Sequence, residues 1–241
     1  KEPECTGARI AGFENVNDAF EVSRKLLKHP ISYDFLEVFN SSRIFGKHLE
    51  LPGKYCLMAA VSDFEDGLKE QLERIESVIV KENCKDVFRL DSVETKNFHS
   101  TIINPPLMNE EVISFRASGR LDQLPRFYNA ALSAFPLVDE PCFSAHAGSG
   151  IFQCWLDGVG TIEDYNRSWR IFSSNCLEGS NHANGRFISV FLDQGPDELS
   201  NMNSVWGEDS ISPVALNLMS NIKKKLDPNQ TLSPGRFINK I

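Results

Sequence analysis

Two patterns of apolar residues alternate along this chain of 241 residues, and this alternation limits the possible folds more than any other feature of the sequence. Short apolar runs typical of buried strands, such as YCLMAAV at Tyr55–Val61 and RFISVFLD at Arg186–Asp193, are separated by stretches with helical spacing. In the longest of these, Glu65–Asn83, an apolar side chain recurs every third or fourth residue. This order predicts an α+β fold, a ferredoxin-like antiparallel sheet with helices packed on one face.

The strand–helix unit occurs twice. In the first copy we expect strands at Ala8–Phe13 and Tyr55–Val61, helices at Asn17–Lys28 and Glu65–Asn83, and a strand or short helix at Ile31–Phe39. In the second copy we expect strands at Val112–Ala117, Cys142–Ala147, Ile151–Leu156 and Arg186–Asp193, and helices at Leu121–Phe135 and Thr161–Leu177. The polar segment Pro196–Ser212 is expected to be a surface loop.

Composition excludes several classes of protein. A net charge of −8 without a basic patch argues against nucleic-acid binding, and no apolar run reaches the length of about 18 residues that a membrane span needs. The six cysteines show no C-x-x-C spacing, and 17 phenylalanines supply ample core. We therefore expect free thiols in a reducing, cytoplasmic environment, and neither a zinc site nor an iron–sulfur cluster built from cysteines.

The last part of the chain predicts a helix with an unusual sequel. Ser212 is suited to cap a helix that runs to Leu226, with Pro213 in its first position. An apolar side chain recurs at helical spacing along one face, and a residue before proline ends the helix at Asp227. The apolar face of this helix consists of Val214, Leu218, Ile222 and Leu226. The tail after the helix, Thr231–Ile241, has no partner of its own.

The segment KKKLDPNQTLSPGRF (Lys223–Phe237), together with Val205-Trp206-Gly207, resembles the C-terminus of FAD-linked 2-hydroxyacid oxidases and dehydrogenases. Among these it is most similar to the FAD-binding accessory subunits of bacterial glycolate oxidases, and the order of elements agrees over most of the chain. The resemblance implies that residues 1–241 form a single cap domain, with 227–241 returning to a missing N-terminal FAD-binding domain. The start at Lys1 rather than methionine agrees with this expectation. Turn chemistry at a helix end is the alternative explanation.

The stretch Ala145–Gln153 adds a second point of resemblance. Catalytic members of this family carry His-x-Gly-Asp-Gly-Asn-Leu-His here and a Glu-His pair on a later strand, and these groups bind a divalent metal. In this chain His146 keeps the first histidine, but Gln153 replaces the second and Asn181 takes the place of the acid. One imidazole and two amides hold a divalent cation poorly, so no metal site is predicted. The candidates for residues that face the cavity are His146, Ser149, Gln153, Asn181 and His182.

The alternative is that His146 is only a hydrogen-bonded residue of a hairpin. In that case the Gly-Ser-Gly turn has the structural role. The other histidines, His29, His48 and His99, have no metal-ligand companion at suitable spacing and are expected in loops, exposed to solvent.

The resemblance also bears on the cofactor. It implies that Pro234, Gly235 and Arg236 lie near a flavin in the complete protein, where a guanidinium suits a phosphate or carboxylate. The chain itself contains no G-x-G-x-x-G and no P-loop. FAD is therefore expected to be bound by the missing domain, and none by these 241 residues alone.

The sequence as a whole predicts the C-terminal cap domain of an FAD-dependent, glycolate-type 2-hydroxyacid oxidase or dehydrogenase that lines the substrate or flavin cavity and is inactive alone. The main alternative is a non-catalytic assembly module that docks the catalytic and iron–sulfur subunits of the same complex, through which it could associate with a membrane. An independent ferredoxin-like domain that binds a small molecule is a third hypothesis.

Overall fold

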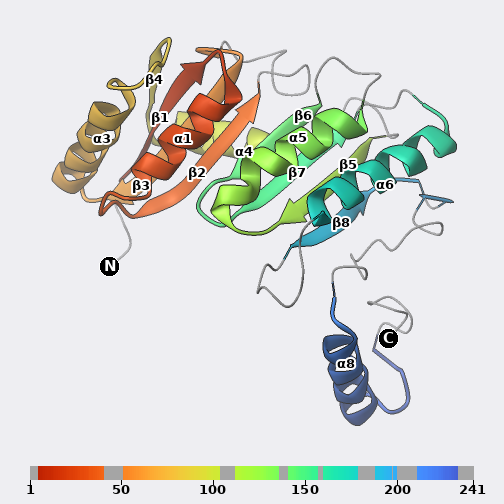
Figure 1. The fold of residues 1–241 in the computed structure, drawn as a ribbon. Coiled ribbons are helices and arrows are strands. Elements are labelled where there is room, and N and C mark those ends of the chain that lie inside the picture. Colours follow the sequence, from red (N-terminus) through yellow and green to blue (C-terminus); the bar gives the residue numbers. More distant parts are fainter. Residues whose placement is uncertain are drawn as a thin grey trace.

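The computed structural model describes residues 5–40, 51–103, 112–135, 141–156, 160–178, 188–196, 198–199 and 211–232. Eight strands form one antiparallel sheet in the order β4-β1-β3-β2-β6-β7-β5-β8 (Figure 1). The strands are β1 (Cys5–Phe13), β2 (Tyr33–Asn40), β3 (Tyr55–Asp63), β4 (Val87–Leu90), β5 (Ile113–Ser118), β6 (Cys142–His146), β7 (Ile151–Leu156) and β8 (Ser189–Gln194). The helices are α1 (Val16–Leu26), α3 (Glu65–Ile79), α4 (Ser92–Ile103), α5 (Leu124–Ala134), α6 (Ile162–Leu177) and α8 (Pro213–Leu226), with a 3-10 turn, η1, at Leu121–Gln123.

The sheet consists of two copies of one unit. The first is β1-α1-β2-β3-α3-β4 and the second is β5-α5-β6-β7-α6-β8, and in each the four strands lie in the order fourth, first, third, second. This is the ferredoxin-like arrangement, so the predicted fold class is confirmed. The copies join where β2 pairs with β6 through three residue pairs, Glu37 with His146, Val38 with Ala145 and Phe39 with Ser144. We call this pairing the seam.

Four helices cover one face of the sheet. Helices α1 and α3 pack against the strands of the first copy, and α5 and α6 against those of the second. The core between them is rich in aromatic side chains. Phe115 of β5, for example, has its ring centroid 5.3 to 5.5 Å from those of Phe135, Trp169 and Phe172. We call the side of the sheet that these four helices cover the helical face.

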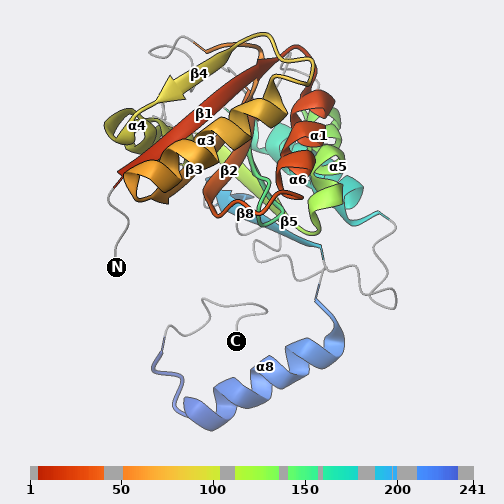
Figure 2. The same ribbon diagram turned by 90° about the vertical axis from the view of Figure 1, so that its left-hand side faces the viewer.

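Helix α4, which the sequence pattern did not reveal, lies on the opposite face, over β1 and β4 (Figure 2). Its Phe98 and Ile102 belong to a second apolar cluster with Ile10, Met58 and Ala60 of the first copy. The face opposite the helical face is therefore covered and apolar in the first copy.

The helix starts follow from capping chemistry. Thr161 and Asp164 form the reciprocal capping pair at the start of α6. Ser212 accepts from the Ala215 amide at 3.2 Å, so the cap predicted there is confirmed. The helix predicted to begin at Asn17 begins at Val16, and its capping residue is Asn15. The segment Ile31–Phe39 forms a strand, and the helix predicted to reach Asn83 ends at Ile79.

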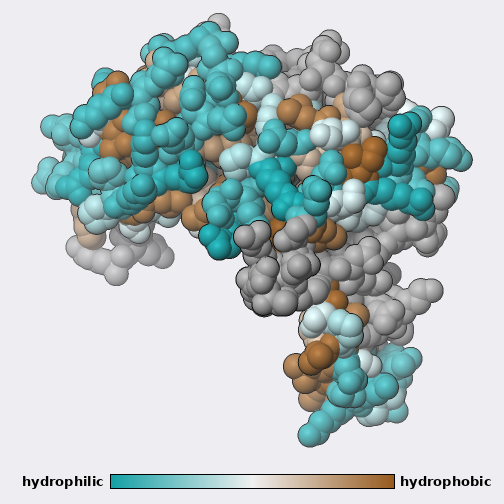
Figure 3. All heavy atoms as spheres, in the orientation of Figure 1, coloured by the Kyte–Doolittle hydropathy of each residue, from teal (hydrophilic) through white to brown (hydrophobic). Residues whose placement is uncertain are grey.

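Helix α8 lies apart from the sheet (Figures 1 and 2), and none of its residues is buried. Its predicted apolar face points to solvent, and hydrophobic side chains gather on this helix in Figure 3. The residues that connect it to β8, apart from 195–196, 198–199 and 211–212, lie outside the described part, as do residues 233–241.

The turn after α8 is organised by Asp227. Its carboxylate accepts from the amides of Thr231 and Leu232 at 2.8 and 3.0 Å and pairs with Lys223 of the last helical turn at 2.7 Å. The hydrogen bond with Lys223, followed by those with the two amides, lowers the pKa of this carboxyl well below its ordinary range. The conspicuous Leu-Asp-Pro-Asn stretch thus folds the chain back at the helix end.

Candidate functional site

The face of the sheet opposite the helical face carries a band of polar side chains around the seam and in the second copy, beside the buried apolar side chains of Cys142 and Trp155. Alternate residues of a strand point to opposite faces, and the neighbours of these polar residues lie in the helical core. Among the described helices, only α4 lies on this side, and it contacts mainly the first copy. We call this surface the polar face; it consists of Glu37 (β2), Ser144 and His146 (β6), Gln153 (β7), Arg116 (β5) and Asp193 (β8).

The strand register brings these residues together. Glu37 lies opposite His146, Ser144 opposite Gln153, and Gln153 opposite Arg116. Residues that face each other across antiparallel strands have Cβ atoms about 4.5 to 5.5 Å apart. The polar face is thus a continuous band across five strands.

A buried carboxylate forms one end of this band. Glu37 is 4% exposed, and its two oxygens have separate partners: Oε1 lies 2.5 Å from His146 Nδ1, and Oε2 accepts from Ser144 Oγ at 3.0 Å. The hydrogen bond with Glu37 raises the pKa of His146 above its ordinary value, since it favours the protonated ring more than burial disfavours it.

His99 lies beside this pair. Contrary to the sequence-based expectation of a solvated loop residue, it belongs to α4 and stacks on Phe35 of β2 with ring centroids 3.6 Å apart. Burial lowers its pKa, although Glu37 and Asp34 act in the opposite direction. The pKa values of the two neighbouring imidazoles are therefore shifted in opposite directions. His29 is exposed, as expected, and His48 lies outside the described residues.

An ion pair forms the other end of the band. Arg116 Nη2 donates to Asp193 Oδ1 at 2.6 Å, and its guanidinium carbon lies 5.4 Å from the centre of the Phe191 ring. Burial raises the pKa of Asp193, and the arginine offsets this only in part. The Nε atom of Arg116 is buried without a hydrogen-bond partner among the described residues.

The predicted site residues are only partly brought together. His146 and Gln153 lie on the polar face, whereas Ser149 is exposed in the turn between β6 and β7. That turn needs a glycine at position 150, whose φ is 73° and where a Cβ atom would lie 2.0 Å from the Gly119 carbonyl oxygen. The remaining candidates, Asn181, His182, Pro234, Gly235 and Arg236, lie outside the described residues.

Sequence reasoning missed Glu37, Ser144, Arg116 and Asp193. None stands in a recognisable motif. Their only local sign is a polar residue at an inward position of an otherwise apolar strand, as in YDFLEVFN around Glu37.

Two absences among the described residues bear on the chemistry. No three His, Cys, Asp or Glu side chains there are grouped so that they could hold a metal ion. No helix in this part is long and apolar enough to cross a membrane.

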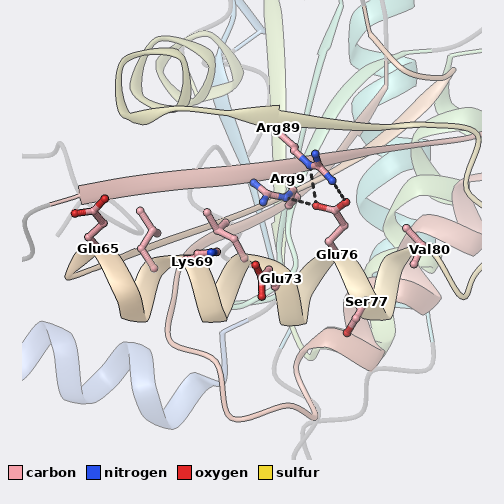
Figure 4. A pocket seen from close by; sticks show the side chains of 10 residues that line it. Arg9, Glu65, Lys69, Glu73, Glu76, Ser77, Val80 and Arg89 are labelled. Carbon is pink, nitrogen blue, oxygen red and sulfur yellow. Dashed lines mark hydrogen bonds and ion pairs between the residues drawn. The ribbon is translucent and has the colours of Figure 1, made fainter.

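A groove of about 700 Å³ lies at the far end of the sheet, on the helical side, between α3, the edge strand β4 and its neighbour β1 (Figure 4). Its charged centre is already satisfied, because Glu76 accepts from Arg9 at 2.8 Å and from Arg89 at 2.5 and 3.0 Å. These bonds, with that of Arg89 the strongest influence, lower the pKa of Glu76 to about 2. The central charges of the groove thus pair with one another.

Comparisons with known proteins agree with the resemblance noted in the sequence. Residues 201–237 match the family model described as FAD linked oxidases, C-terminal domain. A search of curated proteins found no similar sequence. The similarity to the C-terminal segment of FAD-linked oxidases is therefore confirmed, and the glycolate-oxidase likeness stays a prediction.

Two solved structures share the fold. The structure of p-cresol methylhydroxylase with substrate bound aligns with a TM-score of 0.61 and 13% identity over 98% of this chain and 53% of that chain. Alkyldihydroxyacetonephosphate synthase aligns with a TM-score of 0.54 and 9% identity over 94% of this chain and 43% of that chain. This chain thus spans about half the length of the structures that it matches.

Proposed function

We propose that these residues form the C-terminal cap domain of an FAD-dependent oxidoreductase that acts on a small 2-hydroxy acid of the glycolate type. The polar face would line the substrate cavity. The observation that carries this proposal is the band of hydrogen-bonding side chains on the sheet face away from the main helices, in a fold shared with p-cresol methylhydroxylase.

The band suits a hydroxy acid because it offers different groups at its two ends. Arg116 can hold a carboxylate, and His146 can form a hydrogen bond with a hydroxyl group. They are separated by β7 across the sheet and by two residues along it, which places their backbones about 12 Å apart, a distance that two long side chains and a small acid can bridge. Gln153 lies between them.

FAD would supply the hydride acceptor when bound, whereas this chain would bind, orient and enclose the acid. In the described part of the chain, the turns from β1 to α1 and from β3 to α3 contain no glycine-rich loop of the kind that cradles phosphates. The diphosphate of FAD does not fit there. An N-terminal FAD-binding domain is therefore the partner that the proposal requires.

The experiment uses the longer, flavin-containing protein. Under anaerobic conditions, 2-hydroxy acids such as glycolate and lactate should bleach the flavin, and a phenol such as p-cresol should not. Arg116→Gln should raise KM for the acids about 10- to 100-fold, the loss expected for a charge-assisted hydrogen bond. The matched control is Arg120→Gln, since Arg120 pairs with Asp122 away from the polar face. Failure of every acid to bleach the flavin would refute the proposal.

The second candidate is a non-catalytic assembly module of the same kind of complex, in the cytoplasm or held at a membrane through its partners. Gln153, which stands where catalytic relatives are expected to carry histidine, favours it. In that case the protein should bind catalytic and iron–sulfur subunits with unchanged affinity after Arg116→Gln, and its own flavin should not respond to acids.

A further inference from the structure

The Glu37–His146 pair has a feature that the proposed function does not use. Glu37 is buried at the seam, and among the described residues its only cationic partner is His146. The Nδ1 side of the imidazole faces the carboxylate, while the side chain keeps 33% of its surface exposed. A buried carboxylate that holds one side of a half-exposed histidine fixes the direction of the other side.

We propose that His146 Nε2 is the atom of the polar face that accepts the proton of the ligand's hydroxyl group, and that Glu37 is its positioning residue. This inference rests on the proposed function, because it assumes an alcohol as the ligand.

The hydrogen-bond chemistry selects the atom. A carboxylate only accepts hydrogen bonds, so Nδ1 must carry the hydrogen that lies between it and Glu37. A neutral imidazole has one N–H, and Nε2 is then left with its lone pair. Ser144 holds the second oxygen of Glu37, so that the carboxylate cannot rotate freely.

The surroundings leave Nε2 accessible. No described residue forms a hydrogen bond with it, and a Cβ atom added to Gly148 in the turn would lie 3.6 Å from it, in ordinary van der Waals contact. Other titratable groups nearby are His99 of α4, which interacts electrostatically with Glu37 and His146, and Asp34 of β2, which interacts with His99. The raised pKa of His146, caused by Glu37, and the lowered pKa of the half-buried His99 agree with His146 as the acceptor.

The proton and the hydride of the substrate go to separate acceptors. The O–H bond of the substrate breaks and its proton forms a bond with Nε2, which yields an imidazolium stabilised by Glu37. The electron pair of the α-carbon C–H bond leaves as hydride to the oxidant that the proposed function supplies, an enzyme-bound flavin, and the carbonyl forms. Proton acceptance by a positioned base contributes about 10²- to 10⁴-fold to rate.

A structural role is the competing explanation, because the pair also ties the two copies together. The first test therefore needs no activity. In the 241-residue chain labelled with ¹⁵N at histidine, NMR should show neutral His146 as the Nδ1–H tautomer. Glu37→Gln should lower the pKa of His146. The control is His29→Gln, an exposed histidine away from the site, which should change neither. An Nε2–H tautomer in the wild type would overturn the inference.

The second test measures anaerobic flavin reduction by a hydroxy acid in the longer protein. The wild-type rate should rise with pH through the pKa of His146. His146→Gln should lower the rate at least about 100-fold, and Glu37→Gln should move the rise to lower pH with little change in KM. If His146→Gln keeps the wild-type rate and pH profile while the acid still reduces the flavin, the inference fails and the proposed function stands. If variants lose stability and rate together with an unchanged profile, the pair is only a structural clamp. If no acid reduces the wild-type flavin, both fail.

Discussion

Helix α8 presents an apolar stripe that demands a partner. Val214 is 79% exposed, Leu218 60%, Ile222 48% and Leu226 77%. Full burial of such a side chain contributes about 1.5 to 3 kcal/mol, so covering what is still exposed of the four would contribute about 4 to 8 kcal/mol. That gain approaches the whole stability of a typical domain, about 5 to 15 kcal/mol. We predict that the stripe, with the tail Thr231–Ile241, docks on the upstream flavin domain of the longer protein.

The perturbation is Leu218→Glu, at the centre of the stripe. In the 241-residue chain it should change the free energy of unfolding by no more than about 0.5 kcal/mol, because the side chain is mainly in solvent. In the longer protein it should cost about 2 to 4 kcal/mol, since apolar contact is lost and a charge is placed in the interface. Asn217→Glu is the matched control: the position is exposed, lies off the stripe and gains the same charge.

Urea unfolding of both proteins gives these free energies, and hydrogen exchange gives the location. Amides of α8 should exchange readily in the 241-residue chain and be protected in the longer protein. Equal protection in both, or an equal cost of Leu218→Glu in both, would show that α8 belongs to this domain alone and would refute the docking argument.

Three further predictions concern stability and ligands. Glu76→Gln should lower the free energy of unfolding by about 1 to 2 kcal/mol at pH 7, after allowance for solvent screening. Since the pKa of Glu76 is lowered from 4.5 to about 2, the wild type should lose this advantage as the pH falls through that window. Urea unfolding at pH 7 and 2.5 would show the loss. Phe115→Ala should cost about 3 to 5 kcal/mol in the same assay, because three aromatic rings pack against it, and a cost below about 1 kcal/mol would contradict this packing. The 241-residue chain should gain no stoichiometric flavin absorbance from FAD and contain no stoichiometric zinc or manganese by elemental analysis. One metal per chain, lost in His146→Ala, would contradict the prediction that His146, Gln153 and Asn181 hold no metal.

The repeated unit could be predicted from sequence because each copy carries its own buried strands and amphipathic helices. In YCLMAAV nearly every residue is apolar, which fits a strand covered on both faces, and β3 is indeed buried from Tyr55 to Val61. Pairing across the seam could not be predicted, because β2 and β6 are separated by about a hundred residues and no local pattern specifies that contact.

The elements β4 and α4 were missed for physical reasons. β4 has only four residues, too few for a period, and contains Arg89. α4 buries only Thr95, Phe98 and Ile102, and its Ser, Thr and Asn residues are weak helix formers. Its packing over β1 stabilises it, and this packing also brings His99 onto Phe35.

The two copies also explain where a site can exist. In the first copy the face opposite the helical face is apolar and covered by α4, so a ligand has no access to its centre. In the second copy the equivalent surface carries Gln153 and Arg116, and a carboxylate from the first copy, Glu37, reaches it across the seam. Polar residues inside strands oppose local preference and are kept only where partners satisfy them, so their concentration on one face agrees with the ligand site proposed there. A sequence search for such conflicts, strand by strand, would have found Glu37 and Arg116 without any motif.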